Sequence, residues 1–162
     1  MAIDLIEELE KLVDELSAAA IDYALCGGLA VGVHGLPRAT KDIDLLVMRE
    51  DVPRVLEVAK RLGFDVPSRR MIFRAGKPDQ HEMQRVSKLE SGTDLLVSLD
   101  LLIVGPVHQA VWDTRTEVPW REATLWVVSR EGLATMKRFA GRPQDLADIS
   151  RLEGHDDDED QS

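Results

Sequence analysis

Three aspartates lie in otherwise apolar, strand-like stretches, and their spacing could hold a divalent cation. Asp42 and Asp44 stand two residues apart in "DIDLLV", and Asp100 lies in the middle of "SLDLLIV". Residues i and i+2 of a strand point to the same side, so Asp42 and Asp44 share one face, about 6–7 Å apart at the backbone. Like charges this close repel each other and resist losing water. A hard cation such as Mg²⁺ relieves both problems because it prefers carboxylate oxygens.

The third carboxylate of such a site has two candidates. Asp100 is costly in the middle of a buried strand unless it is paired or bound to a metal. Asp94 lies six residues earlier, roughly 20 Å away along an extended strand, and the turn residues Gly92 and Thr93 explain it fully. An Asp-x-Asp pair at a strand start is, taken alone, most often solvated loop chemistry. The addition of Asp100 favours a metal site.

Two glycines precede the aspartate pair. Gly27 and Gly28 lie between an expected strand and an expected helix, where backbone N–H groups could approach a phosphate. The usual meaning of a Gly-Gly pair is a tight turn. Arg38 and Lys41, in the linker that follows, either contact phosphate or offset the aspartates.

The elements that must position these residues alternate along the whole chain. Periodicity and helix-ending residues predict a mixed α/β or α+β fold. Helices are expected over 3–19, 29–35, 51–62, 106–113, 130–140 and 143–152, and strands at about 22–26, 43–48, 70–74, 81–88, 95–104, 116–120 and 124–128.

Length and charge indicate one domain with an acidic tail. Residues 1–153 of the 162 are expected to form a single domain, and 154–162 a disordered tail. The formal charge is −10, and it is −5 without the five acidic residues of 156–160. This argues against a protein that coats nucleic acid. One basic segment, 69–88, carries six basic and two acidic residues and is a candidate local basic site.

The compartment is expected to be the cytoplasm. Cys26 is the only cysteine, no apolar run reaches the length of a membrane helix, and the first residues are acidic and amphipathic.

The order of these motifs resembles the nucleotidyltransferase fold of the DNA polymerase β superfamily. The matching parts are Gly27-Gly28, a short helix, Arg38-x-Thr40, Asp42-Ile43-Asp44 and the "LDLL" around Asp100. The end of the chain, "LATMKRFAGRPQDLADISRL", is similar to the closing helices of the bacterial AbiEii-type branch. The resemblance implies a mixed sheet flanked by helices, with two closing C-terminal helices.

The same resemblance implies residue roles. Asp42, Asp44 and Asp100 would be the catalytic carboxylates and would hold two Mg²⁺ or Mn²⁺ ions. Gly27 and Gly28 would line the triphosphate site. Arg38 and Lys137 would contact the nucleotide, although Lys137 could equally be a solvated helix lysine.

The expected function is Mg²⁺-dependent transfer of a nucleotide from a nucleoside triphosphate to an RNA end, such as that of tRNA, or to a protein hydroxyl. The chain would then be the toxin of a toxin–antitoxin pair, with an antitoxin or a second copy as its partner. The alternative is a catalytically weak nucleotide-binding or protein-interaction module, since many members carry Gly-Ser where this chain has Gly27-Gly28. Phosphoester hydrolysis at the same aspartates ranks lower.

Overall fold

The computed structural model describes residues 4–35, 40–68, 70–140 and 152. Helices and strands alternate along this part of the chain. The helices are α1 (Leu5–Ala18), α2 (Gly27–Val33), α3 (Val52–Arg61), α4 (Gln109–Asp113) and α5 (Arg130–Ala140), with short 3-10 turns η1 (Arg49–Asp51) and η2 (Pro106–His108). The strands are β1 (Ala24–Cys26), β2 (Asp42–Val47), β3 (Val66–Pro67), β4 (Met71–Phe73), β5 (His81–Leu89), β6 (Leu96–Ile103), β7 (Thr116–Trp120) and β8 (Ala123–Val127).

In the described part of the chain, eight strands form one mixed sheet. Their order is β3-β5-β6-β2-β1-β8-β7, and β4 also pairs with β5. β2 runs parallel to β6, and β1 runs parallel to β8, whereas the other neighbours are antiparallel. The two strands that carry the aspartates, β2 and β6, therefore lie side by side in the middle of the sheet.

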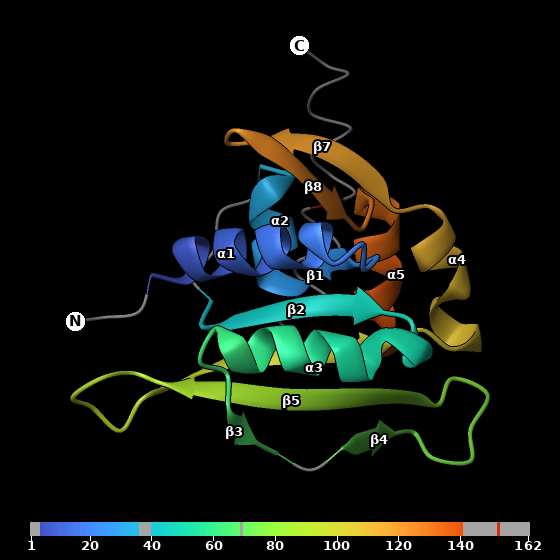
Figure 1. The fold of residues 1–162 in the computed structure, drawn as a ribbon. Coiled ribbons are helices and arrows are strands. Elements are labelled where there is room, and N and C mark those ends of the chain that lie inside the picture. The colour runs from blue at the N-terminus through green and yellow to red at the C-terminus, as the bar shows by residue number, and fades with distance from the viewer. Residues whose placement is uncertain (1–3, 36–39, 69, 141–151, 153–162) are drawn as a thin grey trace.

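Helices cover both faces of this sheet. Figure 1 shows α1 and α3 side by side in front of the sheet, with α2 and α5 behind it. The amphipathic pattern of α1 explains its place, because Leu9, Leu12 and Leu16 face the core and are at most 1% exposed. On β2, Ile43 and Leu45 are fully buried in the same core. The alternation of the strand leaves the aspartates on the opposite side.

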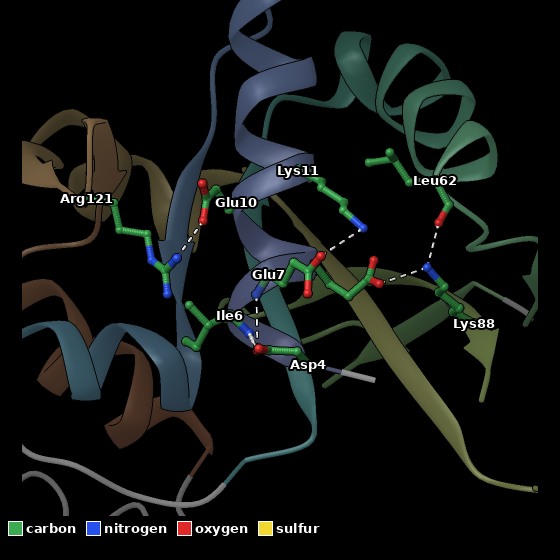
Figure 2. Close-up of polar contacts among 9 residues, drawn as sticks. Asp4, Ile6, Glu7, Glu10, Lys11, Leu62, Lys88 and Arg121 are labelled. Atoms are coloured by element: carbon green, nitrogen blue, oxygen red, sulfur yellow. Dashed lines mark hydrogen bonds and ion pairs between the residues drawn. The ribbon is translucent and has the colours of Figure 1, made fainter. Parts of the chain in front are cut away.

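Polar contacts fix α1 against the rest of the fold. The carboxylate of Asp4 caps its first turn by accepting hydrogen bonds from two backbone N–H groups (Figure 2). Lys88, on β5, donates to Glu8 Oε1 (2.8 Å) and to the carbonyl of Leu62 (3.0 Å), the C-cap residue of α3. Arg121, between β7 and β8, pairs with Glu10. These contacts tie α1 to both halves of the sheet.

The mixed α/β class expected from the sequence is confirmed, and most elements fall within two or three residues of their expected bounds. Two details differ. β3 was not expected, and the start of the strand predicted as buried at 95–104 is exposed, since Leu95 is 58% and Leu96 47% accessible. The second closing helix, expected over 143–152, lies outside the described residues except for the buried Leu152, and so does the tail 154–162. None of the described helices is long and apolar enough to span a membrane.

Candidate active site

One row of side chains crosses four neighbouring strands and gathers the predicted aspartates. Asp44 on β2 stands in register with Asp100 on β6, and Cys26 of β1 stands opposite Asp44 on its other side. Asp42 lies two residues before Asp44 and therefore points to the same face, in register with Ser98. The structure thus brings Asp42, Asp44 and Asp100 together. Asp94, the competing third carboxylate, is an exposed residue of the turn before β6.

Asp100 is stabilised in the middle of its strand by an arginine from β5. Arg85 stands opposite Asp100 in the antiparallel pair, and its Nε and Nη2 donate to Asp100 Oδ1 (2.7 Å) and Oδ2 (3.0 Å). Such a two-pronged, charge-assisted contact is the strongest that a carboxylate makes with a side chain. Asp100 is 4% exposed and would be costly to bury without it. Of the two reasons for a mid-strand aspartate, pairing is the one that the structure shows.

Sequence reasoning missed this pair, although a signal was present. Arg85 was counted among the basic residues of segment 69–88, a candidate local basic site. The turn around Gly92 and Thr93 closes the β5–β6 hairpin, and counting back equally from that turn places Arg85 opposite Asp100.

The carboxylates perturb one another electrostatically. Burial, the negative charges of Asp100 and Asp42, and a hydrogen bond between the Asp44 and Asp100 carboxyls together raise the pKa of Asp44 from its ordinary 3.8 to about 7, against the opposing charge of Arg85. Burial and the charge of Asp100 also raise the pKa of Asp42, whereas Arg85 and Lys41 oppose the shift. Arg85 pairs with one of the three carboxylates, and Lys41 adds positive charge beside Asp42.

Gly27 leaves the space that the Asp44 carboxylate occupies. It begins α2 with a φ of +68°, and a Cβ on Gly27 would overlap Asp44 Oδ2. Both the left-handed backbone and the close approach therefore require glycine. At Gly28 a Cβ would come within 3.1 Å of Thr40 Cβ and 3.2 Å of Thr40 Oγ1. The side chain of Thr40 thus occupies the space that a side chain at position 28 would need.

The predicted nucleotide contacts have different outcomes. Lys137 lies on α5 and is only 8% exposed, so it is not a solvated helix lysine. Burial, followed by the charges of Asp44 and Asp100, raises the pKa of the Cys26 thiol, and the charge of Lys137 opposes this rise, so Lys137 acts on the residue that stands opposite Asp44. Arg38 lies outside the described residues.

The basic segment 69–88 is largely neutralised by carboxylates. Arg70 pairs with Glu82, Arg74 with Asp79, Arg85 with Asp100 and Lys88 with Glu8. Asp79 and Glu82 belong to the segment itself, so only the pairs of Arg85 and Lys88, with carboxylates outside it, lower the local charge that the sequence indicates. Arg49 of η1 adds a two-pronged pair with Glu82.

The chemistry of the row fits a divalent cation. Three carboxylates with mutual repulsion are hard oxygen ligands, and the space above Gly27 lets one of them lie close to the backbone. Among the described side chains, no group of three or more His, Cys, Asp or Glu is disposed to hold one metal ion together. Asp42 and Asp44 are the two aspartates without an ion pair to Arg85 in this arrangement.

The fold is that of nucleotidyltransferases. No family model and no curated protein matches the sequence. The structure is similar to TM1012 from Thermotoga maritima, provisionally described as a nucleotidyltransferase, with a TM-score of 0.64 and 14% identity over 93% of this chain and 92% of that one.

Two further solved structures have a similar fold. The antibiotic-resistance factor ANT(2'')-Ia matches with a TM-score of 0.56 and 15% identity, over 91% of this chain and 80% of that one, and it has also been solved with adenylyl-2''-tobramycin. JHP933 from Helicobacter pylori matches with a TM-score of 0.53 and 20% identity, over 92% of this chain and 64% of that one. At these identities the likeness establishes the nucleotidyltransferase-like fold, a mixed sheet flanked by helices.

Proposed function

We propose that this chain is a divalent-metal-dependent nucleotidyltransferase that uses a nucleoside triphosphate as donor. The observation that carries the proposal is the register of Asp44 with Asp100 on parallel neighbouring strands, with Asp42 on the same face. This row of carboxylates lies in a fold shared with TM1012 and ANT(2'')-Ia.

The residues divide the work as follows. Asp42 and Asp44 would hold Mg²⁺ or Mn²⁺, with Asp100 as the third ligand. The bound ions would neutralise the triphosphate and lower the pKa of the attacking hydroxyl. Gly27 and Gly28 line the triphosphate, and Lys137 and Arg38 contribute positive charge. The acceptor oxygen then attacks the α-phosphorus in line, Asp100 accepts the hydroxyl proton, and pyrophosphate leaves.

The acceptor is an RNA end, such as that of tRNA, or a protein hydroxyl. This choice rests on the resemblance of the end of the chain, "LATMKRFAGRPQDLADISRL", to the closing helices of the AbiEii-type branch, which also suggests a toxin role with an antitoxin or a second copy as partner. Because four of the cations in segment 69–88 are paired with carboxylates, acceptor binding would draw on other surfaces or on a partner. The structural likeness to ANT(2'')-Ia, solved with adenylyl-2''-tobramycin, adds a small-molecule hydroxyl as an acceptor class to test.

Transfer of label tests the proposal directly. The purified chain is incubated with each α-labelled nucleoside triphosphate, Mg²⁺ or Mn²⁺, and total tRNA, cell protein or an aminoglycoside. We expect label on one acceptor class, and a loss of at least about 100-fold in Asp44→Asn and Asp100→Asn, because each removes a negative metal ligand. Asp94→Asn, which changes an exposed aspartate outside the row, is the matched control. Transfer by Asp44→Asn at the wild-type rate would contradict the proposal.

Two observations favour a second candidate, a nucleotide-binding module with weak activity. Gly28 provides no hydroxyl, and Arg85 occupies both oxygens of Asp100. Calorimetric titration with nucleoside triphosphates, with and without Mg²⁺, separates the candidates. Tight Mg²⁺-dependent binding without transfer to any acceptor would favour the module, whereas binding followed by transfer favours the enzyme.

A further inference from the structure

Arg85 lies on β5, which carries none of the three predicted aspartates. The register of the β5–β6 hairpin places it opposite Asp100. Its guanidinium contacts both oxygens of Asp100 at 2.7 and 3.0 Å, and Asp42 and Asp44 also act on it, since their charges raise the pKa of Arg85 after the larger effects of Asp100. One cation therefore interacts with all three carboxylates of the row.

The two partners of this pair are buried to different extents. The Asp100 side chain is 5% exposed, whereas the Arg85 side chain is 37% exposed. Asp100 is held between Asp44 on one side and Arg85 on the other by the register of the sheet. The guanidinium of Arg85 stands at the end of a long, flexible side chain and has access to solvent. It is therefore the member of the pair that can move away from the other.

We propose that Arg85 is the resting counter-ion of Asp100 and competes with a divalent cation for this carboxylate. The inference rests on the proposed function, because it concerns the same carboxylate row. While the pair is closed, a first ion can bind Asp42 and, in exchange for the hydrogen bond between the Asp44 and Asp100 carboxyls, Asp44. An ion that needs Asp100 binds only when the guanidinium leaves both of its oxygens. Arg85 is thus a positioning residue that sets the affinity of the metal-free site for cations.

The experiment measures metal binding in the absence of nucleotide, so its readout is independent of activity. Mn²⁺ binding to the full chain is followed by electron paramagnetic resonance and calorimetry at about pH 8, where the Asp44 carboxyl, with a pKa of about 7, is largely ionised. The variants are Arg85→Met, which keeps the length of the stem but removes the charge, and Arg85→Lys, which keeps the charge but loses the fork. Arg49→Met is the matched control, because it breaks another two-pronged pair on β5, with Glu82, outside the row.

We expect Arg85→Met to bind Mn²⁺ about tenfold more tightly than the wild type, or with one more equivalent, because a competing charge has been removed. Arg85→Lys should lie between the two, and Arg49→Met should match the wild type. In thermal unfolding, Arg85→Met should lose stability in EDTA and regain it with Mn²⁺, by linkage of binding to folding. A merely structural arginine would lower stability without tightening Mn²⁺ binding.

The outcomes separate the inference from the proposed function. Unchanged or weaker Mn²⁺ binding in Arg85→Met, while Asp44→Asn abolishes binding, would overturn the role of Arg85 and leave the metal site standing. Equal binding in the wild type and Asp44→Asn would remove the metal site, and the inference with it. If Arg85→Met does not fold, Arg85→Gln, which retains an amide donor toward Asp100, is held to the same expectation of tighter binding.

Discussion

Replacement of Asp44 by asparagine should stabilise the metal-free protein while it removes the proposed metal site. Burial and the neighbouring carboxylates raise the pKa of Asp44 in the folded state to about 7, compared with the ordinary 3.8 of an exposed chain. The folded protein therefore binds this proton more tightly than the unfolded chain does. The wild type loses stability through Asp44 as the pH rises from about 4 to about 7, and the loss is complete above pH 7.

The size of this effect follows from the pKa values. Each pKa unit corresponds to about 1.4 kcal/mol, so a rise from 3.8 to about 7 corresponds to about 4 kcal/mol as an upper bound. The charge of Asp44 is shared in repulsion with Asp100 and Asp42, and relaxation around the carboxyls reduces the cost. We therefore expect Asp44→Asn to be about 2–3 kcal/mol more stable above pH 7, with almost no difference below pH 4.

Urea unfolding in EDTA at several pH values between about 4 and 8 measures this difference. Asp94→Asn, in the exposed turn before β6, controls for the loss of one negative charge and should follow the wild type at every pH. Saturating Mg²⁺ should stabilise the wild type but not Asp44→Asn, because only the wild type retains the ligand. A stability difference that is constant with pH, or a less stable Asp44→Asn at pH 8, would refute the electrostatic reasoning.

Three further substitutions test the packing around the site and its support. Gly27→Ala should lower the free energy of unfolding by about 2 kcal/mol or more, because its φ of +68° and its overlap with Asp44 both exclude a Cβ; a loss below about 0.5 kcal/mol in urea would contradict this. Gly28→Ser should cost about 1 kcal/mol in the same assay because Thr40 must move by a few tenths of an ångström, and an unchanged free energy of unfolding would show that Thr40 moves without cost. Lys88→Met should cost about 2–3 kcal/mol by leaving the buried Glu8 unpaired, and in a double-mutant cycle Glu8→Gln/Lys88→Met should be more stable than the two single losses predict; additive losses would show that the pair does not couple.

The sequence predicts the central strands and the helices because their patterns are local. The apolar run after Asp44 and the periodic leucines of α1 carry enough signal to locate both elements within two residues. β3 escapes prediction because two exposed residues at a sheet edge carry no period. The exposure of Leu95 and Leu96 could not be predicted because burial depends on which other elements pack on a strand. The sequence of the strand itself does not specify those elements.

The proximity of the three carboxylates could be predicted from the sequence, whereas the pairing of Asp100 with Arg85 could not. Asp42, Asp44 and Asp100 stand out because each is a charged residue in an apolar strand. Arg85 lies in a segment rich in basic residues, where one more arginine carries no such contrast. Its role depends on the residue opposite it on the next strand, and that is a property of register.

The turn between β5 and β6 consequently sets the chemistry of a site that it does not touch. Side chains alternate between the two faces of a sheet, so an insertion between Glu90 and Leu95 that shifted the register of the hairpin by one residue would carry Arg85 to the far face. Asp100 would keep its place beside Asp44 on β2, because the parallel pairing does not depend on that turn. A change in the length of this loop would therefore alter the proposed competition between Arg85 and a metal ion for Asp100. None of the three aspartates would have to change.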